Sequence, residues 1–226
     1  MIDATQLDNP VWSALCSGQA HMARVNSLAR RYAPEVTPLA GLREMSPRAF
    51  SDLRAMTETG EVVGLVNAAP FAVPSGWTVM REIVIAQMLC PLAPPSTAEG
   101  FVELAEGDVP DMVEIVAATE PGPFRPGTIG MGRFIGYRSP EGRLMAMAGE
   151  RMRLDGATEI SAVCTWPEFR GRGLARSLVT RLAADIHAQG RLPFLHVKTD
   201  NAARQLYESL GFAVRGPVHF KVLAAA

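Results

Sequence analysis

Cysteine and histidine are scarce in this 226-residue chain, and the few present are scattered. The three cysteines, Cys16, Cys90 and Cys164, are odd in number, far apart and never in a CxxC pair. This argues against a disulfide framework and for a reducing compartment. The four histidines show no ligand spacing, so we expect no metal site.

The chain also lacks long apolar runs, basic clusters and a leader pattern. Its longest apolar runs, such as residues 83–89, are too short to cross a bilayer, and its acidic N-terminus has no signal-peptide pattern. The formal net charge is −1, without any run rich in Lys or Arg, which excludes the class of basic nucleic-acid binders. We therefore expect a soluble cytoplasmic protein that binds neither nucleic acid nor membrane.

A proline-rich stretch divides the sequence. Residues 90–97 hold three prolines in five positions, which neither a helix nor an inner strand accommodates, so we expect a linker there. The chain before it should form an N-terminal α/β region, residues 1–95. Its expected elements are helices over 21–31 and 47–56, the second capped by Ser46 with Pro47 in its first turn, and strands over 61–66 and 77–89.

The second region, residues 100–226, alternates strand and helix patterns. Leu174, Leu178, Leu182 and Ile186 recur every four residues and predict a helix with one buried stripe, which Gly190 ends. The other expected helices cover 109–118 and 201–210. Strands are expected over 101–104, 133–137, 144–153, 160–165, 194–198 and 213–223. Strands interleaved with helices predict an α/β (α+β) fold with a mixed sheet flanked by helices.

The strongest local signal is a glycine loop between a strand and a helix, Arg170-Gly171-Arg172-Gly173-Leu174-Ala175. Such a loop presents unpaired N–H groups at a helix N-terminus, where a pyrophosphate can bind, and two arginines add charge. The Gly-Lys-Ser/Thr of a nucleoside triphosphatase is absent, and Arg176 stands where a dinucleotide-binding loop has its last glycine. Two turn glycines without a ligand also explain the pattern on their own.

A second motif lies about thirty residues further on, over residues 201–212. Asn201 is a plausible helix cap, and Gly211 can end that helix in the left-handed conformation. Tyr207 is not needed for the buried stripe, which Ala203, Leu206 and Leu210 already form.

Together the two motifs resemble the Gcn5-related N-acetyltransferase (GNAT) superfamily. Its acyl-CoA signature, Gln/Arg-x-x-Gly-x-Gly/Ala, is matched from Arg170 to Ala175, and its downstream Asn…Leu-Tyr-x-x-x-Gly-Phe signature from Asn201 to Phe212. The sequence motif Val-Cys-Thr-x-Pro-Glu-x-Arg-Gly-x-Gly further resembles the FR47-like branch. The superfamily likeness covers roughly residues 100–223 and implies a mostly antiparallel, twisted sheet. Residues 1–95 resemble that branch only loosely and carry no identifiable cluster of chemistry. We interpret them as a scaffold that covers the second half or shapes its substrate entrance, with a degenerate acetyltransferase-like half as the alternative.

The resemblance implies how acyl-CoA is bound. The main chain of Val163, Cys164 and Thr165 would pair with the pantetheine arm, while Asn201 and Arg204 would line the other side of the channel. N–H groups from Gly171 through Arg172, Gly173, Leu174 and Ala175 to Arg176 would hold the pyrophosphate. A main-chain N–H near Val163 or Thr165 would stabilise the oxyanion.

Tyr207 matches the superfamily's usual proton donor to the leaving sulfur, although packing against the cofactor is an alternative. Glu159 matches the base of histone-modifying members, with Glu150 and His196 as rivals. Cys164 has no obvious base beside it, so we interpret it as a small buried apolar residue. The loop over 120–128 either recognises the acceptor or is an ordinary connection.

The leading hypothesis is therefore transfer of an acetyl (acyl) group from acetyl-CoA to an amine of a small molecule by direct attack, by a monomer or homodimer. A domain that binds acyl-CoA without turnover is one alternative. An enzyme that modifies protein N-termini or lysines is another.

Overall fold

The protein is described from a computed structural model, in which residues 3–95 and 99–226 are placed. The N-terminal region begins with the 3₁₀ turn η1 (Ala4–Asp8), helix α1 (Pro10–Cys16) and turn η2 (Ala20–Met22). Three short strands follow, and then a helix and two longer strands: β1 (Arg24–Asn26), β2 (Ala29–Arg31), β3 (Leu39–Leu42), α2 (Pro47–Arg54), β4 (Val62–Asn67) and β5 (Trp77–Leu89).

The C-terminal region starts with β6 (Val102–Leu104), turn η3 (Glu106–Asp108), α3 (Val109–Thr119) and turn η4 (Pro126–Met131). The meander β7 (Phe134–Arg138), β8 (Leu144–Leu154) and β9 (Ala157–Thr165) leads through turn η5 (Pro167–Phe169) into α4 (Leu174–Ala188). The chain ends with β10 (Leu192–Lys198), α5 (Ala203–Ser209) and β11 (Ala213–Ala225). No helix within the described residues is long and apolar enough to cross a membrane.

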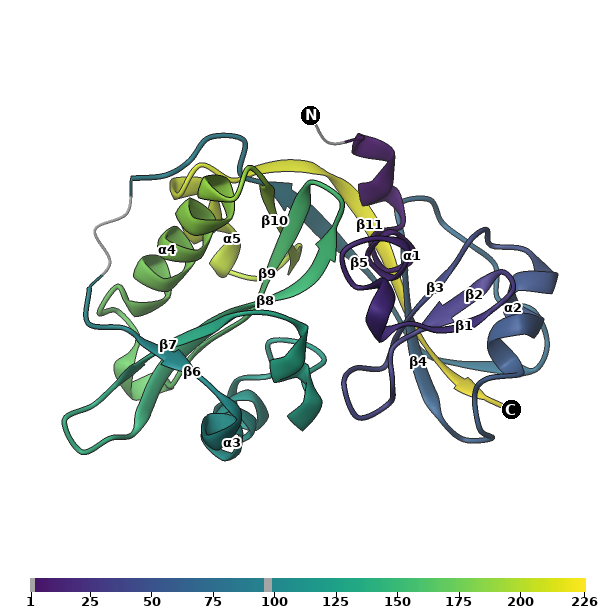
Figure 1. Cartoon of the computed structure of the whole chain (residues 1–226), viewed down its shortest axis with the longest axis horizontal. Helices are drawn as coiled ribbons and strands as arrows, with labels where there is room; N and C mark the ends of the chain where they lie inside the picture. Colours follow the sequence, from purple (N-terminus) through teal and green to yellow (C-terminus); the bar gives the residue numbers. More distant parts are fainter. Residues whose placement is uncertain (1–2, 96–98) are drawn as a thin grey trace.

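All eleven strands of the described chain join one sheet, in the order β1-β2-β3-β4-β11-β5-β10-β9-β8-β7-β6. Neighbours are antiparallel except the pairs β3–β4 and β9–β10. The long strands β5 and β11 run from one half of the molecule into the other (Figure 1). β11 pairs with β4 and β5 of the first region, and β5 pairs with β10 of the second. The expected mixed, mostly antiparallel sheet flanked by helices is confirmed.

A buried amide also joins the two regions. Gln19, which follows α1, donates to the carbonyl oxygens of Met131 (2.9 Å) and Arg151 (2.7 Å). Its own oxygen accepts from the hydroxyl of Tyr32 and from the N–H of Arg153. Because a buried polar group without partners is costly, this network fixes the N-terminal region against β8. The expected division at residues 95–100 stays a prediction, and residues 96–97 of the expected linker lie outside the described chain.

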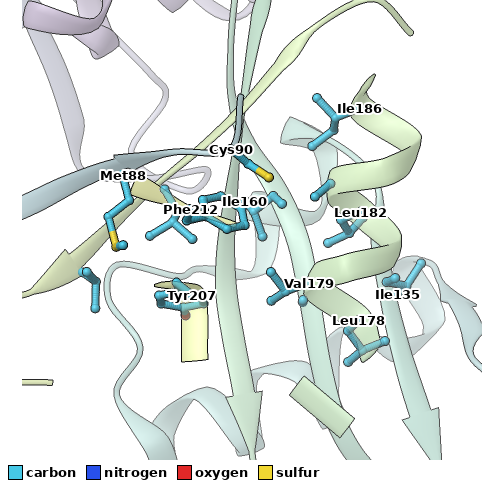
Figure 2. Packing of buried hydrophobic residues seen from close by; sticks show 14 of the residues in the cluster. Met88, Cys90, Ile135, Ile160, Leu178, Val179, Leu182, Ile186, Tyr207 and Phe212 are labelled. Carbon is cyan, nitrogen blue, oxygen red and sulfur yellow. The ribbon is translucent and has the colours of Figure 1, made fainter. Parts of the chain in front are cut away.

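The largest expected helix has the predicted packing. Leu178, Leu182 and Ile186 of α4 are fully buried against strands β7 to β10 and α5, as Figure 2 shows. Gly190 follows the helix with φ of 72°, a left-handed conformation that glycine adopts without a steric penalty. Ser46 caps α2 by accepting a hydrogen bond from the Ala49 N–H, also as predicted.

The prediction of a helix over residues 21–31 is wrong. The structure has β1 and β2 there, paired as a hairpin around Ser27, whose φ is 46°. Arg31 is buried because it forms a double hydrogen bond with Glu61, so a residue counted as polar in the helical pattern belongs to the core. Helix α1 and strand β3 were not predicted.

Candidate functional site

The site begins where two parallel strands separate. β9 and β10 pair only from Leu192–Ala157 to Phe194–Glu159. Beyond that point β10 pairs with β5, while β9 pairs with β8. Among the described residues, the β10-facing edge of β9 from Ile160 to Thr165 has no strand partner. A main chain in this state can hydrogen-bond an extended ligand as if it were an added strand.

A β-bulge lies on this free edge. Met147 pairs with Cys164 and Gly149 with Ser161, so two residues of β9 oppose Ala148 alone. Ala162, inside the bulge, has φ of 51°. A left-handed conformation costs a non-glycine residue about 1–2 kcal/mol, and such strain gathers at functional sites. The bulge leaves Ala162 and Val163 outside the regular ladder with β8, which resumes at Cys164 and Thr165, and it bends β9 at this point.

A cavity of about 920 Å³ lies at the opening between β9 and β10. Of the residues expected to bind or act, seven line it: Val163, Cys164, Thr165, Arg170, Ala175, Asn201 and Tyr207. The others are not on its lining: Glu159, Gly171, Arg172, Gly173, Leu174, Arg176 and Arg204. Residues 120–123 of the loop singled out in the sequence form part of the wall, together with Thr119 at the end of α3, and strands of the N-terminal region form another part.

The glycine loop exposes a row of main-chain donors. Gly171 and Gly173 both have φ of 76°, and α4 begins at Leu174. The first hydrogen bond of the helix joins the Ser177 N–H to the Gly173 carbonyl. None of the six N–H groups from Gly171 to Arg176 has an acceptor among the described residues. Six free donors at the positive end of a 15-residue helix make an anion site.

Side chains around the loop hold its shape. Arg143 lies 4.6 Å from the ring centre of Trp166 and forms a 2.7 Å ion pair with Glu168. Arg176 reaches the Ser209 hydroxyl at 2.8 Å and so connects α4 with α5. Arg204 pairs with Glu208 of its own helix at 2.9 Å, which directs it away from the cavity lining. Sequence reasoning missed Arg143, because it precedes the loop by more than twenty residues.

Tyr207 is presented to the cavity by the short helix α5. The Asn201 side chain accepts a 2.8 Å hydrogen bond from the Ala203 N–H at the start of that helix, and Gly211 follows its end with φ of 89°. The ring packs against Phe212, and both belong to the buried cluster that also contains the stripe of α4 (Figure 2). Burial, followed by the nearby Cys164 thiol, raises the pKa of Tyr207 to about 12. Tyr207 therefore keeps its proton at neutral pH.

Glu159 is fully buried at the vertex where β9 and β10 part. Both of its oxygens accept from Arg151, at 2.7 and 2.8 Å, and Oε1 also lies 2.8 Å from Nδ1 of His196. Burial by itself raises the pKa of this carboxyl, but the Arg151 charge and the hydrogen bonds from His196 and Arg151 lower it to about 2. The carboxylate is thus ionised, takes part in three hydrogen bonds and does not line the cavity.

Gln87 of β5 determines which ring nitrogen of a neutral His196 carries the proton. The Gln87 amide nitrogen donates to the Leu7 carbonyl at 2.9 Å, and its oxygen accepts from Arg215 at 3.1 Å. These partners orient the amide so that its nitrogen donates to Nε2 of His196, 3.1 Å away. A neutral His196 then carries its proton on Nδ1 and donates it to Glu159. Both ring nitrogens are therefore engaged by the protein.

The structure gives neither Cys164 nor Glu150 a part in proton transfer. Burial raises the pKa of the Cys164 thiol to about 12, so it is protonated and unreactive at neutral pH. Glu150 is buried and pairs with Arg153 at 2.5 Å, and it does not line the cavity. The described residues contain no group of three His, Cys, Asp or Glu side chains that could hold a metal ion.

Comparison with known proteins places this geometry in context. The sequence model of the FR47-like protein family matches residues 135–220. A search of curated proteins found no match. A GNAT-family acetyltransferase structure from Novosphingobium aromaticivorans is 40% identical, with a TM-score of 0.89, over 97% of this chain and 98% of its own.

More distant structures share the fold over nearly the full length. A GCN5-related N-acetyltransferase from Kribbella flavida is 18% identical, with a TM-score of 0.63, and covers 100% of this chain and 96% of its own. A conserved protein from Staphylococcus epidermidis is 11% identical, with a TM-score of 0.53, over 90% and 93%. At these identities the likeness shows the fold alone.

Proposed function

The chain belongs to the GNAT family of acetyltransferases, and from that premise we propose that it transfers an acetyl group from acetyl-CoA to the amine of a small molecule in the cytoplasm. The observation that carries the proposal is the row of six free N–H groups at the start of α4, beside the free edge of β9. This combination suits a ligand with a pyrophosphate at one end and an amide-bearing arm at the other.

The residues fit this donor in two stretches. The main chain of Val163, Cys164 and Thr165 would pair with the amide groups of the arm, because the bulge directs this edge into the cavity. The N–H groups from Gly171 to Arg176 would hold the pyrophosphate, with Arg170 and Arg172 adding charge. Asn201, which lines the cavity, would lie across the channel, and Arg204 would line that side only if it left its ion pair with Glu208. Bound there, acetyl-CoA supplies a thioester carbonyl that an amine can attack.

We propose that Tyr207 acts on the leaving sulfur. Proton transfer from a phenol of pKa about 12 to a thiolate of pKa about 8.5 is uphill by about 5 kcal/mol. Tyr207 would therefore first donate a hydrogen bond to the sulfur. It would complete the transfer as it recovers a proton from the newly acylated nitrogen, so that the proton count balances.

Glu159 is proposed as a positioning residue. A carboxylate with pKa of about 2, already accepting from Arg151 and His196, is a weak base, and it does not line the cavity. Its ion pair instead holds Arg151 and His196 on the cavity wall. The proton of the incoming amine then leaves through water or before binding.

The charge of the cavity supports a small-molecule acceptor over a basic protein segment. The lining includes four cationic side chains, Arg81, Arg151, Arg170 and Lys198, and one carboxylate, Glu120. A lysine-rich peptide would be repelled by this lining, because Arg81, Arg170 and Lys198 have no carboxylate partner among the described residues, whereas Arg151 is paired with Glu159.

We also propose that residues 1–95 are a degenerate acetyltransferase-like half. β3 and β4 are parallel and joined through α2, as β9 and β10 are joined through α4. The start of α2 differs from that of α4: Pro47 has no N–H, and the Ser46 side chain occupies the Ala49 N–H. Donors for a second pyrophosphate are therefore missing there, and this half would serve as a wall of the cavity.

Incubation of the protein with acetyl-CoA and a panel of amines, with free thiol measured over time, tests the function. We expect thiol release that depends on the amine and stoichiometric formation of an N-acetyl product by mass spectrometry. CoA binding by calorimetry with no amine-dependent release across the panel would contradict the proposal and favour a non-catalytic acyl-CoA binder.

A further inference from the structure

The acceptor side of the cavity has an apolar wall that comes from the N-terminal half of the sheet. Leu39 of β3, Val66 of β4, Phe220 and Val222 of β11, and Ile83 and Ile85 of β5 all line it. Gly64 makes room for this surface, because a Cβ there would lie 2.9 Å from the Phe220 ring. The wall gives a ligand a flat, apolar surface several side chains wide.

Arg151 of β8 lines the same cavity, and its guanidinium group is held in place. Arg151 uses Nε and Nη2 to bind Glu159, and Nη1 has no acceptor among the described residues. Its side chain is 12% exposed and lines the cavity, so Nη1 is accessible to a ligand. Because Glu159 holds the guanidinium plane, little side-chain entropy is lost when Nη1 binds an anion.

A second arginine that lines the cavity, Arg81, is not held in one position by an ion pair with any described residue. Arg81 lies on β5 beyond Ile83, is exposed, and has no ion pair among the described residues. Its side chain is free to move, so it can attract an anion without fixing its position. Arg151 also adjoins Glu159 and His196 at the vertex where β9 begins its free edge, whereas Arg81 does not.

We propose that the acceptor is an amine that carries a carboxylate next to the amino group and a large apolar side chain, an apolar α-amino acid. The carboxylate would bind Nη1 of Arg151, and the side chain would pack on the wall of Leu39, Val66, Phe220, Val222, Ile83 and Ile85. The amino group, one carbon from the carboxylate, would then face the bulge of β9. This inference rests on the proposed function and adds the substrate class.

A matched set of amines tests it. L-Phenylalanine, phenylalaninamide and phenethylamine share the apolar body, and glycine keeps only the carboxylate. A charged hydrogen bond contributes about 1.5–3 kcal/mol, so we expect kcat/KM for phenylalanine to exceed that for phenethylamine by about 10- to 150-fold. Glycine should be poorer by at least a similar factor. Equal rates for phenylalanine, its amide and phenethylamine would overturn the inference while leaving acetyl transfer to amines intact.

Variants identify the arginine. Removal of Arg151 alone leaves Glu159 buried and unpaired, so the test uses the double variant Arg151→Gln with Glu159→Gln, which keeps a hydrogen-bonded pair. We expect it to bind CoA as before but to lose most of the preference for phenylalanine over phenethylamine. Arg81→Gln should keep that preference. Loss of the preference in Arg81→Gln, with the double variant unchanged, would contradict the assignment to Arg151. No thiol release from any amine would instead contradict the proposed function.

Discussion

Oε1 of Glu159 and Nδ1 of His196 lie 2.8 Å apart across the point where β9 and β10 separate. The same oxygen accepts from Arg151, so one buried carboxylate connects three strands, β8, β9 and β10. This arrangement places a charged network at the wall of the cavity, which Arg151 and His196 line. Its strength determines how the site responds to acid.

Glu159→Gln should remove a pH-dependent part of the stability. The folded pKa of about 2 lies below the ordinary value of 4.5, so the carboxylate stabilises the fold above pH 4.5 and this contribution is lost as the pH falls toward 2. For a shift of this size the loss is about 3 kcal/mol. Urea unfolding across this pH range should show it in the wild type and not in the variant. Glu208→Gln, which removes a surface carboxylate, should keep the full loss, and an identical pH profile for Glu159→Gln would contradict the role of this ion pair.

Tyr207→Phe should lower kcat about 100-fold or more, because general acid groups typically contribute 10²–10⁴-fold. The dissociation constant of CoA should change little, since the ring and its packing on Phe212 remain. Steady-state thiol release and calorimetry measure the two quantities. Tyr137→Phe is the control: its hydroxyl bonds Ser177 and the Glu99 carbonyl outside the cavity lining, so kcat should be unchanged. Full activity of Tyr207→Phe would remove Tyr207 from the acid role.

The raised pKa of Tyr207 can be observed directly. The chain has three tyrosines, so the phenolate absorbance lost in Tyr207→Phe can be isolated by subtraction. Because the folded pKa is about 12, we expect no Tyr207 ionisation below pH 10.5 while the protein stays folded. A difference titration with a midpoint near 10 would show that the phenol is solvated and would weaken the proposed mechanism.

Gly173→Ala should weaken CoA binding. At φ of 76° an alanine is strained by about 1–2 kcal/mol, which the loop relieves by moving its N–H groups out of position. We expect the dissociation constant of CoA to rise about tenfold. Gly190→Ala carries the same strain at the other end of α4, with φ of 72° and open space around its Cβ, and should lose stability without losing affinity. Equal CoA affinity in both variants would contradict the pyrophosphate site.

Cys164→Ala should retain turnover within about threefold, because a thiol with pKa of about 12 is not a nucleophile at neutral pH. Double-reciprocal plots of initial rate against amine concentration, at several acetyl-CoA concentrations, should intersect rather than run parallel, as direct attack requires. Parallel lines, with loss of activity in Cys164→Ala, would indicate a covalent acyl-enzyme. Iodoacetamide should label the exposed Cys16 well before the buried Cys164.

The elements that the sequence predicted share a physical basis. The buried stripe on α4, the cap at Ser46 and the strand over 77–89 are each encoded by residues close together in the sequence. Where long-range contacts decide, prediction failed. Arg31 is buried with its hydrogen bonds accepted by Glu61, thirty residues later, and by Met56, and the segment forms a hairpin where a helix was expected.

The sequence by itself determined the family and predicted the donor end of the site, because a glycine loop between a strand and a helix acts through neighbouring main-chain groups. Only the tertiary structure brings together the surface that we propose for the acceptor. Its wall joins Leu39, Val66 and Phe220 from strands far apart in the chain, and Arg151 becomes a fixed cation only once Glu159 and His196 meet. Such charges and surfaces are created by packing, so no local pattern encodes them.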